Sequence, residues 1–185
     1  ANTTDLRPEA IRESVAAACR IARHTSEDPA AGLADADRMA QDVPDLDLYH
    51  PWQLDADEAA RIACDCEDAA RAVDPRISNS EGATLYTQES SFIYGNSHGF
   101  VGGYPSTRHS LSCAVIAQEG EQMQRDYWYD SGRLPSELAD PATIGRTAAE
   151  RTLARLNGRQ LGTRECPVLF RADVAPRLLR SLFGA

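Results

Sequence analysis

The chain has 185 residues, a length typical of one domain or of one domain with part of a second. Its formal net charge is −9, and its basic residues are scattered along the sequence instead of clustered. This charge argues against direct, sequence-independent binding to nucleic acid, because such binding requires lysine and arginine side chains that neutralise phosphates.

Membrane insertion is not expected either, because no apolar run approaches the length of a membrane-spanning helix. No charged and then apolar leader opens the chain, so we expect a cytoplasmic protein. The five cysteines follow no pairing pattern, and Cys64 and Cys66 point to different faces of a predicted helix. We therefore expect buried free thiols in a reducing cytosol. The start at Ala1 without a methionine, and the end directly after an apolar helical pattern, predict a fragment of a longer protein.

The first predicted helix spans residues 8–24. Pro8 suits the first helical position, and the apolar residues of one face are Ile11, Val15, Ala18 and Ala22. Residues 26–53 contain three prolines and predict a long surface connection, with one helical turn near Asp35 to Ala40.

The second predicted helix spans residues 55–73. Asp55 at the cap and Glu58 three positions later form a capping box. One stripe of this helix carries Ile62, Ala63, Cys66, Ala69, Ala70 and Val73. The many alanines predict a close approach to a neighbouring element.

An antiparallel meander is predicted from about Arg76 to Tyr129. Short runs of β-branched and aromatic residues are separated there by Gly82, Gly95-Asn96, Gly102-Gly103 and Gly120, which predicts four strands joined by tight turns. In one strand, Leu111, Cys113 and Val115 alternate with a more polar set, so one face is expected to be buried. We expect this face to pack against the helices at 8–24 and 55–73.

A third helix is predicted from Asp140-Pro141 to about Leu156, ended by Asn157-Gly158. A linker over 159–165 precedes a short buried strand, Cys166 to Phe170. Asp173 then caps a final apolar helix that runs to Phe183. The predicted fold class is α+β: an antiparallel β-meander packed against helices, followed by a helix and the start of a second, truncated domain.

One candidate catalytic neighbourhood consists of Ser97, His98, His109 and Asp126. A nucleophile needs a base within hydrogen-bond reach and a third group that orients the base, and Asp126 is the candidate for that third group. The sequence contains no nucleophile elbow, however, and adjacent residues on a strand point apart. We therefore favour a structural role for these residues.

Candidate cofactor sites are equally weak. The four histidines, His24, His50, His98 and His109, lie in four separate segments, and none has a ligand partner at helical spacing. The glycines from Gly95 to Gly103 open no helix, so they do not predict a phosphate-binding loop. No catalytic, cofactor-binding or metal-binding residue is predicted, and no cofactor.

Several longer motifs are more informative. They are Asp45-Leu-Asp-Leu-Tyr-His-Pro, Asn79-Ser-Glu-Gly, Tyr94-Gly-Asn-Ser-His-Gly-Phe, Ser106-Thr-Arg-His-Ser-Leu-Ser, Gln124-Arg-Asp-Tyr and Arg151-Thr-Leu-Ala-Arg-Leu. Together they resemble the PmbA (TldE) branch of the TldD/PmbA family. The resemblance covers essentially the whole chain.

This resemblance implies a cytoplasmic protein of bacteria or archaea that is much longer than the present chain. Residues 1–158 would belong to the amino-terminal α/β domain without its first strands. Residues 159–185 would be a linker and the truncated beginning of the carboxy-terminal domain. The family is associated with modulation of DNA gyrase, maturation of a peptide microcin and degradation of an antitoxin. Its TldD and TldE members form a heterodimeric metalloprotease.

The resemblance also identifies a departure from the metal-binding branch. In TldD-type members a helix carries His-Glu-x-x-x-His, and the corresponding positions here are Arg180, Ser181 and Ala185. Arginine cannot deprotonate to bind a metal, and serine does not replace a carboxylate general base. The resemblance therefore implies a metal-free partner of a TldD-like, metal-bearing subunit, acting on peptides or unfolded polypeptides. Independent protease activity is in doubt.

Two alternatives to this role stay open at the level of sequence. One is a stand-alone hydrolase that uses the Ser97, His98, His109 and Asp126 neighbourhood. The other is a gyrase-binding modulator without a peptidase role. We also expect self-association through an exposed edge of the sheet, because unpaired strand edges recruit other chains.

Overall fold

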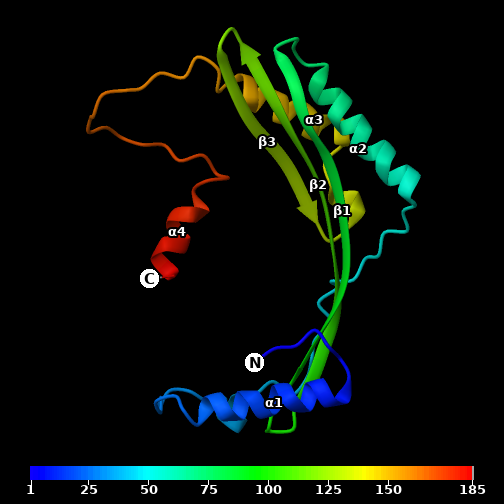
Figure 1. The fold of residues 1–185 in the computed structure, drawn as a ribbon, viewed down its shortest axis with the longest axis vertical. Helices are drawn as coiled ribbons and strands as arrows, with labels where there is room; N and C mark the ends of the chain where they lie inside the picture. Colours follow the sequence, from blue (N-terminus) through cyan, green and yellow to red (C-terminus); the bar gives the residue numbers. More distant parts are fainter. Residues whose placement is uncertain (185) are drawn as a thin grey trace. The chain divides into compact units, whose positions relative to one another are not determined.

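The computed structural model describes residues 1–184 (Figure 1). Its main elements, in chain order, are α1 (Pro8–Ala22), α2 (Ala56–Arg71), β1 (Ile77–Gly95), β2 (Val101–Glu119), β3 (Gln122–Gly132), α3 (Pro141–Leu153) and α4 (Pro176–Phe183). Two short 3-10 helices are η1 (Ala36–Arg38) and η2 (Pro135–Glu137). The chain forms two compact units. The first comprises 1–45 with 93–103, and the second comprises 46–92 with the chain from Tyr104 onward.

The sheet is an antiparallel meander in the order β1-β2-β3, as predicted, but it has three strands instead of four. Two of the predicted breaks do not end a strand, because Gly82 lies within β1 and Gly102 lies within β2. Gly82 adopts a φ of +93°, a left-handed conformation that a glycine accepts without interrupting the strand. The chain therefore turns only between β1 and β2 and at Gly120, which leaves β1 and β2 with 19 residues each.

The helices α2 and α3 cover one face of the sheet (Figure 1). On this face β2 buries Leu111, Cys113 and Val115 in the predicted alternation. Asp55 caps α2, since its side chain accepts a hydrogen bond of 2.7 Å from the amide of Glu58, which confirms the predicted cap. The core comprises Cys66, Ala70, Ile77, Leu111, Cys113, Val115, Ala117, Ile144, Ala148, Ala149 and Leu156.

Gly145 explains why α2 is rich in alanine. A Cβ atom at Gly145 would lie 2.0 Å from the carbonyl oxygen of Cys66 and 3.0 Å from the amide nitrogen of Ala70. The two helix backbones are therefore in direct contact. The neighbour predicted from the alanines of α2 is α3.

The helix predicted over 8–24 does not have the expected role. It forms as α1, but it buries no side chain, and its apolar residues Ile11 and Val15 are 45% and 59% exposed. It lies in the first unit, whereas α3 accompanies α2 on the sheet. The physical reason is the larger buried surface of α3, on which Ile144, Ala148 and Thr152 are fully buried.

Two predictions for the last third of the chain are wrong. Residues Cys166 to Phe170 form no strand and are exposed, with Leu169 97% accessible, because none of the three strands takes this run as a neighbour in the described sheet. Asp173 does not cap the final helix, which begins at Pro176, and instead forms an ion pair with Arg171. Across residues 1–184, no helix is long and apolar enough to cross a membrane.

Candidate functional site

The structure does not bring together His109 and Asp126 of the candidate Ser/His/Asp neighbourhood. Ser97 and His98 lie in the turn between β1 and β2, within the first unit, whereas His109 and Asp126 lie in the second unit. On β2, His109 is opposite Gly132, and Asp126 on β3 is opposite Val115. At the usual rise per strand residue, these two positions are roughly 20 Å apart. Asp126 therefore cannot orient His109 as a catalytic base.

His109 holds the segment before α2 against the sheet. Its side chain is fully buried, its ring meets Trp52 edge to face at 5.6 Å, and its Nε2 lies 3.0 Å from the carbonyl oxygen of His50. The neighbouring Thr107 accepts a hydrogen bond of 3.0 Å from the amide of His50, and its own amide donates to Leu48 at 2.9 Å. These contacts give His109 the structural role that the sequence favoured.

Asp126 belongs to an ion-pair cluster between β3 and α3. Its carboxylate lies 3.6 Å from a guanidinium nitrogen of Arg151 and 3.6 Å from one of Arg155. Arg151 also lies over the ring of Trp128, at 4.8 Å from the centroid, and reaches Asp173 at 3.4 Å. Arg151 on α3 and Arg155 after it thus share one carboxylate of β3, so this cluster fastens the end of α3 to the sheet and to the following segment.

Arg180 and Ser181, which the sequence resemblance aligned with a metal-binding motif, do not fit a metal. Arg180 and Ser181 are exposed on α4, and the Ser181 hydroxyl donates a hydrogen bond of 3.1 Å to the carbonyl of Arg177. Ala185 lies outside the described residues. A guanidinium and a hydroxyl are not zinc ligands. Within the described part of the chain, no three histidine, cysteine, aspartate or glutamate side chains converge in a way that could hold a metal ion.

The cysteines are less buried than predicted. Cys66 and Cys113 are buried and face each other between α2 and β2, whereas Cys19, Cys64 and Cys166 are exposed. The hydrogen bond with Cys113 and the burial of the side chain raise the pKa of the Cys66 thiol. A buried thiol with a raised pKa is a poor nucleophile, so Cys66 has a packing role.

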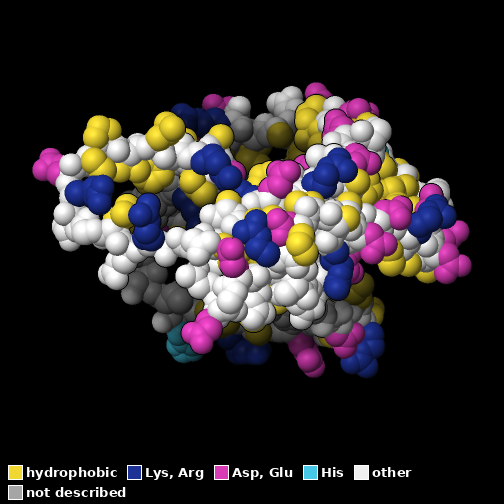
Figure 2. Space-filling view, turned by 90° about the horizontal axis from the view of Figure 1, so that it is seen from above, with side chains coloured by type: hydrophobic (Ala, Val, Ile, Leu, Met, Phe, Trp, Pro, Cys, Tyr) yellow, Lys and Arg dark blue, Asp and Glu magenta, His cyan; other side chains and the backbone are white. Residues whose placement is uncertain are grey.

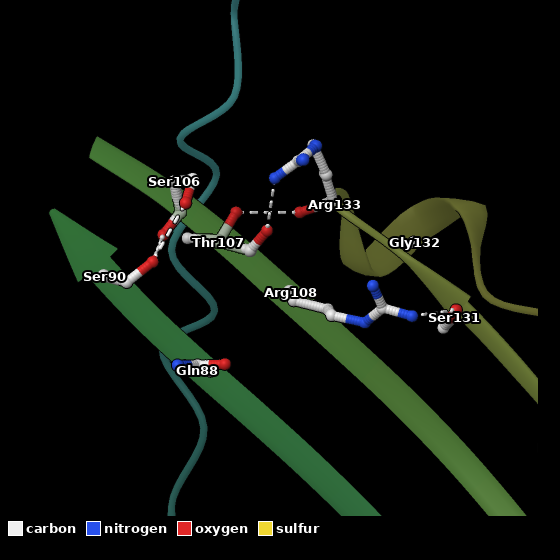
Figure 3. Close-up of a pocket in the computed structure, with 8 residues that line it drawn as sticks. All are labelled: Gln88, Ser90, Ser106, Thr107, Arg108, Ser131, Gly132 and Arg133. Carbon is white, nitrogen blue, oxygen red and sulfur yellow. Dashed lines mark hydrogen bonds between the residues drawn. The ribbon is translucent and has the colours of Figure 1, made fainter. Parts of the chain in front are cut away.

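A polar hollow that the sequence did not reveal lies in the second unit, where β3 ends beside β2 (Figure 3). Its volume is about 410 Å³. The lining residues come from all three strands and the residue after β3: Gln88, Ser90, Ser106, Thr107, Arg108, Ser131, Gly132 and Arg133. Ser106 and Arg108 alternate with the buried Thr107 and His109, so their side chains lie on the sheet face away from α2 and α3.

Two guanidinium groups line this hollow, and both are held by the sheet. Arg108 donates a hydrogen bond of 3.2 Å to the Ser131 hydroxyl, and Arg133 donates one of 3.2 Å to the backbone carbonyl of Thr107 (Figure 3). The hydroxyls of Ser90 and Ser106 are 2.9 Å apart. Among residues 1–184, neither guanidinium is paired with a carboxylate, and the lining itself contains no acidic residue.

Most arginines elsewhere in the described residues are paired with carboxylates or stand outside a cavity of this kind. Carboxylates and guanidiniums are interspersed on the face seen in Figure 2, with no extended block of basic side chains there. Ten arginines in the described chain have a carboxylate within 4.0 Å: Arg7, Arg12, Arg61, Arg71, Arg76, Arg125, Arg146, Arg151, Arg155 and Arg171. The polar hollow is therefore distinguished by two arginines that share one cavity and lack such a partner.

Comparison with protein families places most of the second unit in a known domain. Residues 49–156 match the model of the PmbA/TldA metallopeptidase central domain. Among curated proteins, the chain is 49% identical over 185 residues to Metalloprotease PmbA of Escherichia coli O157:H7, and 44% identical over 185 residues to a Metalloprotease PmbA homolog of Haemophilus influenzae. Each match covers 100% of this chain and 41% of the relative, so the chain spans about two-fifths of their length.

Two crystal structures share the fold. A candidate modulator of a DNA gyrase from Thermotoga maritima superposes with a TM-score of 0.60 at 19% identity, over 66% of this chain and 28% of that protein. TldE from Thermococcus kodakarensis superposes with a TM-score of 0.56 at 17% identity, over 80% of this chain and 33% of that protein. At these identities the superpositions establish the α+β fold alone.

Proposed function

Because the chain belongs to the TldD/PmbA metallopeptidase family, we propose that it is the central part of a metal-free subunit that pairs with a TldD-like, metal-bearing subunit to cleave peptides. The similarity to proteins named Metalloprotease PmbA supports the link to proteolysis. The main support for the metal-free role comes from the side chains of α4, which are not metal ligands. By the sequence resemblance, Arg180 and Ser181 correspond to a histidine and a glutamate of the metal-binding branch. An arginine cannot bind a metal, and a serine cannot act as the general base for a metal-bound water.

The same proposal includes the domain layout and the location of the protein. Residues 1–158 are assigned to the part of the family that precedes its carboxy-terminal domain, including the central domain matched by residues 49–156, and 159–185 to a linker and the beginning of the carboxy-terminal domain. Leu156 is the last buried residue of the described chain, which supports a boundary near this point. A cytoplasmic location accords with the three exposed free cysteines, since a reducing compartment keeps thiols in this state.

The stand-alone hydrolase has less support. Its catalytic residues would have to converge, whereas Asp126 lies roughly 20 Å along the sheet from His109 and is already paired with Arg151. A role in gyrase modulation, named for the Thermotoga protein, gains no support from that likeness, because a distant structural likeness supports only the fold.

A peptidase assay with and without the metal-bearing partner tests the proposal. We expect the full-length protein alone to leave an unfolded peptide substrate intact, even with added zinc. The mixture with its TldD-like partner should cleave the substrate, and a chelator should abolish this cleavage.

Matched variants show which of the two subunits carries the catalytic metal site. Arg180→Ala with Ser181→Ala in this chain should leave the activity of the mixture unchanged, whereas replacement of a metal-ligating histidine in the partner should abolish it. Chelator-sensitive cleavage by the full-length protein alone would overturn the proposal.

A further inference from the structure

We propose that the polar hollow formed by Arg108, Arg133 and the surrounding serines binds the carboxylate group of a peptide. The carboxylate can come from the peptide's carboxy terminus or from an acidic side chain. The choice of a peptide as ligand rests on the proposed function, whereas the choice of an anionic group rests on the geometry of the hollow alone.

The charge of the hollow favours an anion. Two guanidiniums line it, and no acidic side chain does. A guanidinium carries five N–H donors in a planar fork that fits the two oxygens of a carboxylate. Arg108 and Arg133 each make a single hydrogen bond to a side chain or carbonyl of the lining, so most of their donors remain available to a ligand.

Arg133 is positioned in advance for such a ligand. Its backbone carbonyl accepts a hydrogen bond of 3.0 Å from the hydroxyl of Thr107, and its side chain donates to the carbonyl of the same residue at 3.2 Å. Thr107 is itself only 1% exposed. This reciprocal pair fixes both ends of Arg133 to a buried residue, which lowers the entropy lost when a ligand binds.

The uncharged part of the lining is polar, so the hollow suits a peptide better than an apolar ligand. Gln88, Ser90, Ser106 and Ser131 supply hydroxyl and amide groups that can donate to a carboxylate or bond to peptide amides. The volume of about 410 Å³ admits one or two residues of a peptide, at the lower end of the usual range for ligand pockets. The hollow also lies on the face that α2 and α3 leave open, beside the strands β1 and β2.

Binding of three labelled peptides to the full-length protein, without its partner, tests the inference. The peptides share a short alanine-serine sequence and differ in charge: one has a free carboxy terminus, one is amidated, and one is amidated but contains a glutamate. We expect the amidated neutral peptide to bind with a dissociation constant at least tenfold larger than that of one or both of the other peptides. The peptide that retains affinity identifies the source of the carboxylate.

The variants Arg108→Gln and Arg133→Gln should each weaken binding of the peptide that keeps its affinity by about tenfold, because each variant removes one charged guanidinium group. Arg159→Gln is the matched control, since Arg159 is exposed, lies outside the hollow and should leave the affinity unchanged. Arg108→Lys keeps the charge without the planar fork and should give an intermediate loss. Circular dichroism melts confirm that each variant is folded.

Unchanged affinity in both glutamine variants, or equal affinity for all three peptides, would overturn the inference. Tighter binding of inorganic phosphate than of any peptide would overturn the assignment to peptides. The measurement is independent of cleavage. If the hollow binds the carboxylate but the mixture of subunits cleaves nothing, the proposed function fails and this site does not.

Discussion

Gly145 determines how closely α2 and α3 can approach each other. A methyl group added at this position of α3 would meet the backbone of α2, at 2.0 Å from the carbonyl oxygen of Cys66. A helix backbone cannot shift locally as a flexible side chain can. The separation of the two helices, and with it the packing of Cys66 and Ala70 in the core, therefore depends on the absence of a side chain at Gly145.

The substitution Gly145→Ala should destabilise the protein by about 3 kcal/mol, the upper end of the usual cost of overpacking, despite the better helix propensity of alanine. Urea unfolding measures this loss as a lower transition midpoint. Gly162→Ala is the matched control, because a Cβ atom at Gly162 has no neighbour within 4 Å. If both variants unfold at the midpoint of the parent, the helices do not meet at Gly145.

At the scale of elements, the sequence predicted best where the signal was local. Asp55 caps α2 as its capping box indicated, and the alternation around Leu111 matches the buried face of β2. The predicted fourth strand failed because a glycine can lie inside a strand as well as end one, as Gly82 does. The run Cys166 to Phe170 failed because a strand requires a partner, and pairing is not encoded within five residues.

The candidate site was less predictable than the fold. The arrangement of Arg108 and Arg133 depends on where β3 ends relative to β2, which is a tertiary feature. The polarity of Ser106-Thr-Arg was visible, but nothing in the sequence connected it to Arg133. For His109, the absence of a nucleophile elbow favoured a structural role, and in the structure its Nε2 lies 3.0 Å from the carbonyl oxygen of His50.

Asp74 links the end of α2 to the first strand and gives this junction a dependence on pH. Its carboxylate accepts hydrogen bonds from the amide and the side chain of Arg76, at 2.8 and 3.0 Å. The side-chain hydrogen bond from Arg76 lowers the pKa of Asp74 from 3.8 to about 2. A carboxylate with a depressed pKa stabilises the folded state fully above its ordinary pKa and loses this contribution as the pH falls toward 2.

We expect Asp74→Asn to lower the melting temperature slightly at neutral pH and to have less effect as the pH falls from about 4 to about 2. The difference in melting temperature between the variant and the parent, measured across this range, is the readout. Asp42→Asn, at an exposed position in the long connection, serves as the control for a general loss of negative charge. A constant difference at every pH would show that the carboxylate of Asp74 does not couple to folding.

For the molecule as a whole, the main feature is a sheet with two unprotected edges. The order β1-β2-β3 leaves the outer side of β1 and of β3 without a neighbouring strand in the described sheet. The strand β1 is the longer of the two and carries exposed apolar residues toward its end, with Phe92 54% and Ile93 75% accessible. A long edge strand with apolar side chains is a template for pairing with another chain.

We therefore expect the isolated chain to self-associate through β1, with a sedimentation coefficient that rises with concentration. Ile93→Lys should reduce this association, because a charge on an edge strand opposes strand pairing. Met123→Lys, on the other edge strand, is the comparison and should have little effect. A single species across all concentrations would contradict the expectation, and a larger effect of Met123→Lys would assign the contact to β3.

The contact between α2 and Gly145 also has a consequence for synthesis on the ribosome. The apolar stripe of α2 emerges first, but the helix that covers it emerges only after the entire sheet has been translated. Contacts between such distant parts of a chain form late in folding. Until Leu156 has left the exit tunnel, Cys66 and Ala70 have no partner helix, and this stripe of the nascent chain is not covered by α3. The stripe of α2 is thus the segment that a chaperone would protect during translation.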